Sequence, residues 1–375
     1  MPESKPESVS AALTGLVREA LSAAGGWLPF DRFMSMVLYA PGLGYYARDS
    51  RQFGLMPSSG SDFVTAPELS PAFGRTLAVQ VGQAFDALSA SGGAGCGELW
   101  EFGAGSGALA SQLLEALGDR VTAYTIVDVS GSLRARQQQR LAAWGSRVRW
   151  ADALPERLCG VVVGNEVLDA MPARLMAFDG QRWHERGVAW DGARGQLAFA
   201  DVPAEWQPPV PGPFAPGTVT ECHDQAQAFV RTLADRLDSG LALFVDYGFP
   251  EHEYYHPQRI GGTLMCHRAH RVDADPLSDI GEKDITVHVD FTGIAWAAQE
   301  AGLEVLGYTS QARFLLNCGL LGQLEDASLP ERAAAQKLIT EHEMGELFKV
   351  LALGRGLDPK GGLIGFAQGD RSHRL

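Results

Sequence analysis

The chain has 375 residues, of which 46% are hydrophobic, enough for one large globular domain or two smaller ones. Its 45 acidic side chains outnumber 31 Lys and Arg, and the formal net charge of −14 argues against a nucleic-acid-binding surface, because phosphates are neutralised by clustered basic residues. No apolar run reaches the roughly 18 to 20 residues of a membrane helix, so we expect no membrane association.

Two further features of composition concern the compartment. The five cysteines are scattered and never spaced as CxxC, which indicates reduced thiols rather than a disulfide framework or a zinc-thiolate site. The first ten residues, MPESKPESVS, resemble neither a signal peptide nor an Arg-rich mitochondrial presequence. We therefore expect a cytoplasmic protein.

The first part of the chain, residues 1–95, is predicted to be a helical N-terminal cover. Amphipathic stretches at 8–25 and 29–40 end at Gly25-Gly26 and Pro41-Gly42, and a third helical stretch precedes the Gly- and Ser-rich linker at 89–97.

From Glu98 onward, short apolar strands alternate with helical segments, which predicts an α/β fold with a doubly wound parallel sheet. Seven strands are expected, at 98–102, 123–130, 147–153, 160–172, 241–249, 303–311 and 362–369. This places a Rossmann-like core at 96–310 with a β-hairpin insertion at about 173–217, a helical insertion at 311–361, and the last strand of the core within 362–375.

A glycine-rich turn, Gly103-Ala104-Gly105-Ser106-Gly107, lies between the first strand and its helix, where backbone N–H groups can approach a nucleotide-type cofactor. Asp128 ends the next strand, about where an acid accepts hydrogen bonds from a ribose diol. The spacing also satisfies the dinucleotide fingerprint, so NAD or FAD remains an alternative. Two features favour S-adenosylmethionine over NAD or FAD as the cofactor. Glu101 precedes the glycines, and the predicted sheet ends in two strands late in the sequence.

Polar residues also follow the fourth strand, at the rim where open α/β sheets bind ligands. Asn165, Glu166 and Asp169 could orient a cationic nitrogen nucleophile by charge-assisted hydrogen bonds, or they could cap the following turn. Asp246-Tyr247 ends the fifth strand at the same rim.

The stretch His252-Glu253-Tyr254-Tyr255-His256 matches the H-E-x-x-H signature of zinc peptidases. Pro257 follows the second histidine directly, and a residue before proline is disfavoured in a helix, so the two imidazoles would not share a helix face. We expect no metal site.

Several segments in order along nearly the whole chain resemble the MidA family of class I S-adenosylmethionine-dependent methyltransferases. They include FDRFMSMVLYAPGLGYY (30–46), SDFVTAPELSPAFG (61–74), EFGAGSGALA (101–110), GNEVLDAMP (164–172), VDYGF (245–249) and MGELFKVLALGRG (344–356). The resemblance implies a Rossmann-like seven-stranded fold, S-adenosyl-L-methionine as cofactor and S-adenosyl-L-homocysteine as product. Ser61 stands where many members have Gly.

The resemblance also implies roles for individual residues. The expected cofactor-binding residues are Glu101, Gly103, Ala104, Gly105, Gly107, Asp128, Val129 and Asn165, with Asp152 toward the adenine amino group and Thr65, Pro67 and Glu68 from a covering segment that also brings Tyr45 and Asp62 near. The expected catalytic residues are Asn165, Glu166 and Asp169 beside the transferred methyl. Apart from the resemblance, His288 in the segment DITVHVDF (284–291) is expected to be catalytic as a proton acceptor. Histidines such as His270 and His288 are also common framework residues.

Mitochondrial members of the family are regarded as protein-arginine methyltransferases acting on a subunit of respiratory complex I. The resemblance therefore implies a protein acceptor methylated on nitrogen, plausibly arginine. The alternatives are a non-catalytic assembly factor that binds the cofactor, and an NAD- or FAD-dependent oxidoreductase. The apolar stretches 314–321 and 347–354 are either buried core or the interface of a homodimer.

Overall fold

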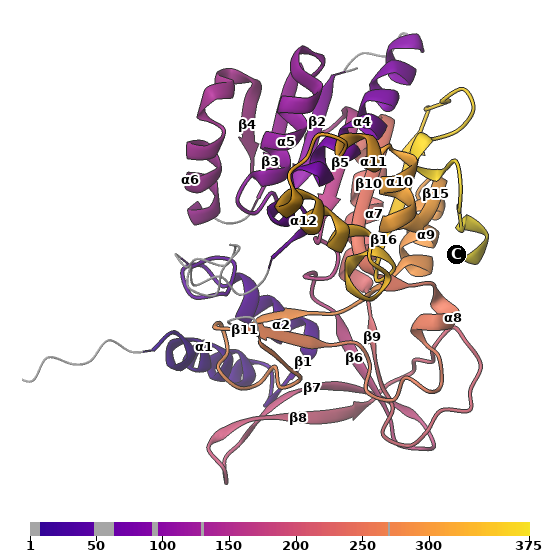
Figure 1. Cartoon of the computed structure of the whole chain (residues 1–375). Coiled ribbons are helices and arrows are strands. Elements are labelled where there is room, and N and C mark those ends of the chain that lie inside the picture. Colours follow the sequence, from indigo (N-terminus) through magenta and orange to yellow (C-terminus); the bar gives the residue numbers. More distant parts are fainter. Residues whose placement is uncertain (1–7, 49–63, 92–96, 129–130, 269–270) are drawn as a thin grey trace, which may run out of the picture.

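The computed structural model describes residues 8–48, 64–91, 97–128, 131–268 and 271–375. Two lobes lie one above the other in Figure 1, and the upper lobe is built on an eight-stranded sheet of order β15-β16-β10-β5-β2-β3-β4, with β14 paired to β10. The strands are β2 (Glu98–Phe102), β3 (Ala123–Val127), β4 (Val148–Ala151), β5 (Leu158–Asn165), β10 (Leu237–Phe249), β14 (Val289–Asp290), β15 (Glu304–Ser310) and β16 (Phe348–Arg355).

The strands from β10 to β4 are parallel, whereas β16 runs antiparallel to both β10 and β15. Both faces of the sheet are buried, since Val161 and Val163 of β5 face one hydrophobic core and Val162 faces the other. One core contains α4 (Ala72–Ala90) and α5 (Ala108–Leu117), and the other contains α7 (Asp224–Arg236) and α9 (Phe291–Glu300). The predicted α/β class is confirmed.

The last strand of the core differs from the prediction. Residues Ile364–Phe366, inside the stretch predicted as a strand, form a short 3-10 helix, and the strand is β16, inside the stretch 311–361 predicted as helical. Val350 and Leu351 of β16 are fully buried in opposite cores, so the strand has no polar face and its Leu- and Ala-rich run resembles a helix. The helices predicted there are α10 (Gln311–Asn317), α11 (Leu320–Gln323) and α12 (Leu329–Ile339).

The lower lobe contains the predicted hairpin insertion, whose strands are β6 (Arg174–Phe178), β7 (Trp183–Asp191), β8 (Gln196–Pro203) and β9 (Val219–Cys222). They form a sheet with β1 (Trp27–Pro29) of order β1-β7-β6-β9, in which β8 pairs with β7. A small sheet of β11 (Met265–Arg268), β12 (Arg271–Asp273) and β13 (Asp284–Thr286) lies beside it, and Figure 1 shows β11 close to α2.

The predicted N-terminal cover is divided between the two lobes. Helices α1 (Val9–Ala23) and α2 (Phe30–Tyr39) share a core with the insertion, where Phe33 packs with Leu175 and Val188, while α4 packs against the main sheet. An amphipathic stripe shows that a helix buries one face but does not identify the surface that covers it.

Three other sequence signals can be placed. Helix α8 (Glu251–Tyr254) ends before His256, so H-E-x-x-H does not lie on one helix, and no group of three metal-ligating side chains occurs among the described residues. Phe314, Leu315 and Leu320 lie in the upper-lobe core together with β16, which favours the buried-core alternative and leaves the homodimer alternative without support in the described parts of the chain. No helix within the described ranges has the length and apolarity needed to span a membrane.

Candidate active site

A cavity of about 730 Å³ lies where the two lobes meet, at the carboxyl ends of β2, β3, β5 and β10. The lower lobe contributes α2, β11 and β13 to its lining. Twelve of the predicted site residues line it: Thr65, Pro67, Glu68, Glu101, Gly103, Ala104, Gly105, Asp128, Asn165, Glu166, Asp169 and His288. Val129, Asp62 and His270 lie outside the described residues.

The glycine-rich turn has a backbone that only glycine adopts without strain. Gly103, Gly105 and Gly107 have φ of +60°, +52° and +80°, and a Cβ on Gly103 would lie 3.1 Å from Cγ2 of Val167. Gly107 does not line the cavity but is the N-cap of α5, and its N–H donates to the carbonyl of Ala104 at 2.7 Å. The turn thus directs the start of α5 and its free N–H groups toward the cavity.

Asp128 and the turn are held by a side chain that the sequence did not indicate. The buried Gln137 donates from Nε2 to the carbonyl of Gly105 at 3.0 Å and to Oδ2 of Asp128 at 2.8 Å, and its Oε1 accepts from Nε1 of Trp150 at 2.9 Å. Gln137 lies in the polar helix α6 (Gly131–Arg140), where nothing in the pattern LRARQQQR distinguishes it from its neighbours.

Glu101 is buried beneath the glycine turn and accepts a hydrogen bond from the Tyr124 hydroxyl at 2.7 Å. Burial raises the pKa of Glu101 to about 8, and the nearby charge of Asp128 adds to this effect. Two carboxyl groups therefore face this end of the cavity, where a bound positive charge would favour their ionised forms.

The short helix α3 (Ala66–Leu69) lies across the glycine turn. The Glu68 carboxylate accepts hydrogen bonds from the Ser106 hydroxyl and from Nη1 of Arg140, and Arg140 also donates to Ser106 at 2.7 Å. Gln112 of α5 donates to the carbonyl of Pro67 at 2.7 Å. These bonds bring the predicted covering residues against the turn.

The other end of the cavity is acidic and strained. Glu166 has φ of +54°, a left-handed conformation that is unfavourable for a residue with a side chain, and its Oε1 accepts from Nδ2 of Asn165 at 3.1 Å. Asp169 is 4% exposed and accepts from the Tyr247 hydroxyl at 2.5 Å, while its Oδ1 is buried without a hydrogen-bond partner among the described residues. Burial raises the pKa of Glu166 to about 8 and that of Asp169 to about 6.

Asp246, predicted at the same rim, supports the acidic turn that carries Glu166 and Asp169. Its Oδ2 accepts from the backbone N–H groups of Val167, Leu168 and Asp169 at 3.1, 2.9 and 3.3 Å, and its Oδ1 accepts from the N–H of Tyr247 at 2.9 Å. Burial, with the neighbouring carboxyls, raises its pKa. Its bonds give Asp246 a structural role, while Tyr247 lines the cavity.

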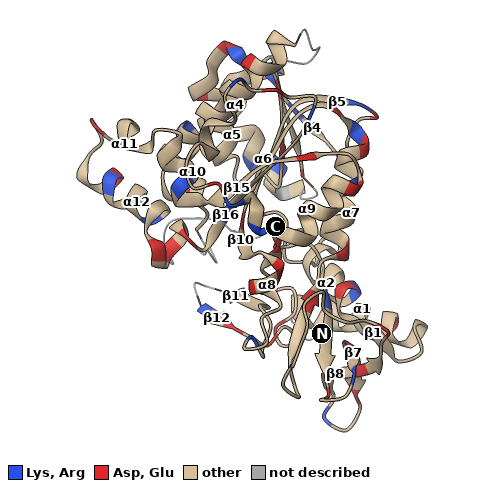
Figure 2. Ribbon diagram, turned by 90° about the vertical axis from the view of Figure 1, so that its right-hand side faces the viewer, with Lys and Arg blue, Asp and Glu red and all other residues tan. Residues whose placement is uncertain are grey.

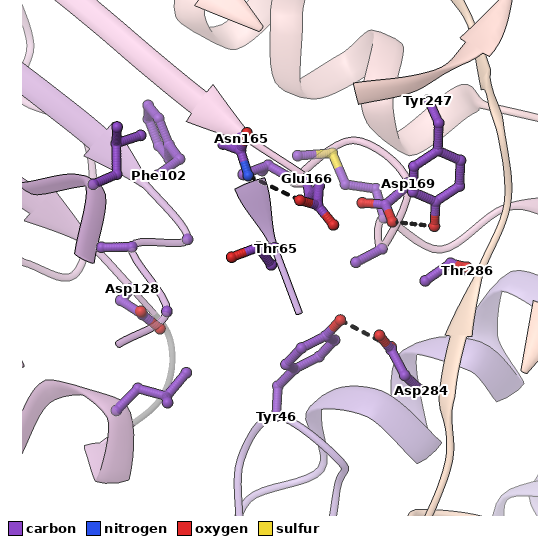
Figure 3. Close-up of a pocket in the computed structure, with 18 of the residues that line it drawn as sticks. Tyr46, Thr65, Phe102, Asp128, Asn165, Glu166, Asp169, Tyr247, Asp284 and Thr286 are labelled. Carbon is purple, nitrogen blue, oxygen red and sulfur yellow. Dashed lines mark hydrogen bonds between the residues drawn. The ribbon is translucent and has the colours of Figure 1, made fainter. Parts of the chain in front are cut away.

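The lower lobe adds residues that sequence reasoning had not assigned to the site. Tyr39 and Tyr46 line the cavity with stacked rings 5.6 Å apart, and the Tyr46 hydroxyl donates to Oδ1 of Asp284 at 2.8 Å (Figure 3). Tyr45, the predicted neighbour, is instead buried and packs edge-on against Tyr46 at 5.0 Å. The signal was present in the GYY segment, but adjacent tyrosines face different surroundings and the prediction named the wrong one.

His288 packs with Phe249 and Tyr247, with ring centroids 5.4 and 4.9 Å apart respectively. Burial, followed by the charge of Arg259, lowers its pKa to about 4, so the imidazole is neutral near pH 7.

Asp152 is placed away from the cavity. Its side chain is 88% exposed and pairs with Arg134 at 2.5 Å, because β4 ends at Ala151 and the following residue faces solvent. The predicted contact of Asp152 with the adenine gains no support from the described lining of the cavity.

Comparison with known proteins identifies the family. Residues 76–309 match the model of a family described as "Putative S-adenosyl-L-methionine-dependent methyltransferase". The chain belongs to this family. A crystal structure of a Burkholderia thailandensis protein bound to S-adenosyl-homocysteine is 51% identical, with a TM-score of 0.91 and complete coverage of both chains. A native structure from the same organism is 50% identical, with a TM-score of 0.87 and complete coverage of both chains.

More distant relatives are named as arginine methyltransferases. The protein arginine methyltransferase NDUFAF7 homologues of Drosophila melanogaster and Caenorhabditis elegans are 28% and 27% identical, over 95% and 91% of this chain and 89% and 87% of their own lengths. The protein is thus an S-adenosyl-L-methionine-dependent methyltransferase, as the MidA resemblance implied, and the oxidoreductase alternative gains no support. These relatives are named as mitochondrial proteins, as is that of Danio rerio, which contradicts the predicted cytoplasmic location.

Proposed function

We propose that this methyltransferase acts on a guanidinium nitrogen of arginine in a protein. The observation that carries the proposal is the concentration of acidic side chains in the cavity, whose ionised forms a bound cation would favour. Its described lining includes six carboxyl side chains and no Lys or Arg: Glu68, Glu101, Asp128, Glu166, Asp169 and Asp284. Acidic residues are visible where the lobes meet in Figure 2. Buried carboxylates are costly without a positive partner, and no hydrogen-bond donor among the described residues reaches Oδ1 of Asp169. A cationic acceptor satisfies both conditions.

The cofactor belongs at the end of the cavity formed by the glycine turn. The N–H groups of Ala104, Gly105 and Ser106 suit its carboxylate, the carboxylate of Asp128 suits its ribose hydroxyls, and Glu101 suits its ammonium group. Thr65, Pro67 and Glu68 close this end because α3 is bonded to the turn. When bound, S-adenosyl-L-methionine supplies an electrophilic methyl group on a positively charged sulfur.

The acceptor belongs at the end formed by Glu166 and Asp169. Both carboxyls accept hydrogen bonds from a guanidinium, and Oδ1 of Asn165, also without a partner among the described residues, is a further acceptor. Holding the nitrogen in line with the methyl group supplies proximity and orientation. Methylation of guanidinium releases one proton, which Glu166, Asp169 or the neutral His288 can accept.

The test is transfer of isotopically labelled methyl groups into a protein extract from cells that lack the gene, followed by acid hydrolysis and amino-acid analysis. Label in methylarginine is expected, with a loss of about 100-fold or more in Glu166→Gln and Asp169→Asn. Asp238→Asn, a half-buried acid paired with the exposed Arg157 away from the cavity, is the control and should keep full activity.

Three outcomes would contradict the proposal. Label in methyllysine would refute arginine as acceptor, and label only in small molecules would refute a protein acceptor. Tight binding of S-adenosyl-homocysteine without any transfer would favour the non-catalytic assembly factor instead.

A further inference from the structure

We propose that Asp284, held by Tyr46, determines acceptor specificity by placing a carboxylate from the lower lobe against the side of the guanidinium opposite Glu166 and Asp169. The inference rests on the proposed function and extends it to the second lobe. Carboxylates that contact the acceptor from both lobes would favour a planar guanidinium over the primary ammonium of lysine.

Asp284 is positioned for this role by its strand. It begins β13, is 2% exposed and lines the cavity, and Figure 3 shows it with Tyr46 on the side of the cavity away from Glu166. The hydroxyl of Tyr46 fixes one of its oxygens, and Tyr46 is itself fixed by ring contacts with Tyr39 and Tyr45. The carboxylate is therefore held in one orientation before any acceptor arrives.

The two acidic walls are also linked to one another. The N–H of Val287, one residue after β13, donates to the backbone carbonyl of Asp169 at 3.0 Å. The strand that carries Asp284 is thus bonded to the turn that carries Asp169, although the two lie more than a hundred residues apart in the sequence. This bond fixes the relative positions of the two carboxylates.

Glu166, Asp169 and Asp284 line the same cavity, and their charges act on one another. The charges of Asp169 and Asp284 both raise the pKa of Glu166, after the larger effect of burial. Such mutual repulsion is relieved by a cation between the acids. Oδ1 of the nearly fully buried Asp169 has no partner among the described residues and supplies an acceptor for it.

Guanidinium suits this arrangement better than ammonium does. It carries five N–H donors in a rigid plane and can meet carboxylates on different edges at once, whereas ammonium is a compact, strongly hydrated charge. Tyr39, Tyr46 and Tyr247 line the same cavity, and aromatic rings attract a planar cation.

The test uses three synthetic compounds in which adenosine carries, through its 5′ carbon, an alkyl guanidine, an alkyl amine or the neutral urea of the same shape. Binding to the full-length protein is measured by calorimetry, with S-adenosyl-homocysteine as a reference ligand. For the unaltered protein we expect the guanidine to bind about 100-fold more tightly than the urea and about 10-fold more tightly than the amine.

In Asp284→Asn the guanidine should lose about 10- to 100-fold in affinity, its preference over the amine should fall to within about threefold, and S-adenosyl-homocysteine and the urea should change by less than about threefold. Tyr46→Phe keeps the ring and should cost the guanidine about 3- to 10-fold. Asp201→Asn, which removes a surface partner of Arg186 in the lower lobe, is the control and should change nothing.

The outcomes separate the two proposals. If the unaltered protein does not distinguish the guanidine from the urea, the arginine function itself fails. If it does distinguish them, and Asp284→Asn keeps that distinction or loses all ligands equally, Asp284 is a framework residue and the inference is overturned. Tyr46→Phe gives a second measurement if Asp284→Asn does not fold, and an unchanged preference there would overturn the inference in the same way.

Discussion

Replacing Asp246 by Ala should remove the hydrogen bonds that hold the acidic turn, which carries Glu166 and Asp169. The glycine turn at the other end of the cavity should remain intact. Asp246 is 1% exposed and is the acceptor for four backbone N–H groups, those of Val167, Leu168, Asp169 and Tyr247. No other side chain holds three consecutive N–H groups of the site in this way within the described residues. The carboxyl therefore fixes the conformation of the loop that carries the proposed acceptor-binding residues.

The magnitude follows from those four bonds. A hydrogen bond to a charged acceptor contributes about 1.5–3 kcal/mol, and a buried N–H left without a partner costs about 1–3 kcal/mol. The contributions are not additive, since the four bonds share one carboxyl group and some N–H groups will find water. The burial that raises the pKa of Asp246 is an opposing cost that the substitution removes. We expect a net loss of about 3–5 kcal/mol for Asp246→Ala and about 1–3 kcal/mol for Asp246→Asn, which keeps one acceptor oxygen.

The assay is equilibrium unfolding in urea, combined with methyl transfer and with S-adenosyl-homocysteine binding on the folded protein. Asp238→Asn on the same strand is the control and should stay within about 0.5 kcal/mol, because its pair with Arg157 is exposed. Transfer should fall much more than binding of S-adenosyl-homocysteine. A loss of less than about 1 kcal/mol for Asp246→Ala, with transfer unchanged, would refute the structural role assigned to this carboxyl.

Three further predictions concern the cofactor end, pH and metals. Gln137→Leu, which removes a buried side chain that bonds the glycine turn but does not line the cavity, should weaken S-adenosyl-homocysteine binding by about 10-fold in calorimetry, and unchanged affinity would contradict the positioning role. In the folded protein Glu101 and Glu166 have a pKa of about 8, above the ordinary value of 4.5, so their contribution to stability is complete below pH 4.5 and is lost as pH rises through 8. Urea unfolding of the free protein should therefore show a free energy of unfolding that declines by a few kcal/mol over this range. The double variant Glu101→Gln, Glu166→Gln should lack this decline. Finally, the double variant His252→Ala, His256→Ala and treatment with EDTA should both leave methyl transfer unchanged, and a loss in either would restore the metal hypothesis.

Much of the cofactor end could be predicted from sequence because it is local. The strand, the tight turn and the helix that form it are consecutive, and glycines at 103, 105 and 107 directly encode a backbone with positive φ. Asp128 lies one strand later, at a distance set by the βαβ unit. Gln137 could not be predicted, since its importance depends on which of three adjacent glutamines faces inward.

Only the upper-lobe side of the proposed acceptor end was predicted. The apolar strand is followed within five residues by three polar side chains, Asn165, Glu166 and Asp169, and this pattern indicates polar groups at the edge of the sheet. Tyr46 and Asp284 are 238 positions apart, and nothing local indicates that they meet. The strand β16 was missed for a related reason, because burial on both faces removes the alternation by which a strand is recognised.

The sequence by itself determined the α/β class, the glycine turn at one end of the cavity, and the family, since each depends on short-range patterns that do not require a partner surface. Tertiary structure decided which helices cover which lobe, that β16 lies between β10 and β15, and that Asp246 supports the acidic turn while Asp284 faces it. These features arise from contacts between distant segments, where burial and hydrogen-bonding partners are set by the folded chain as a whole.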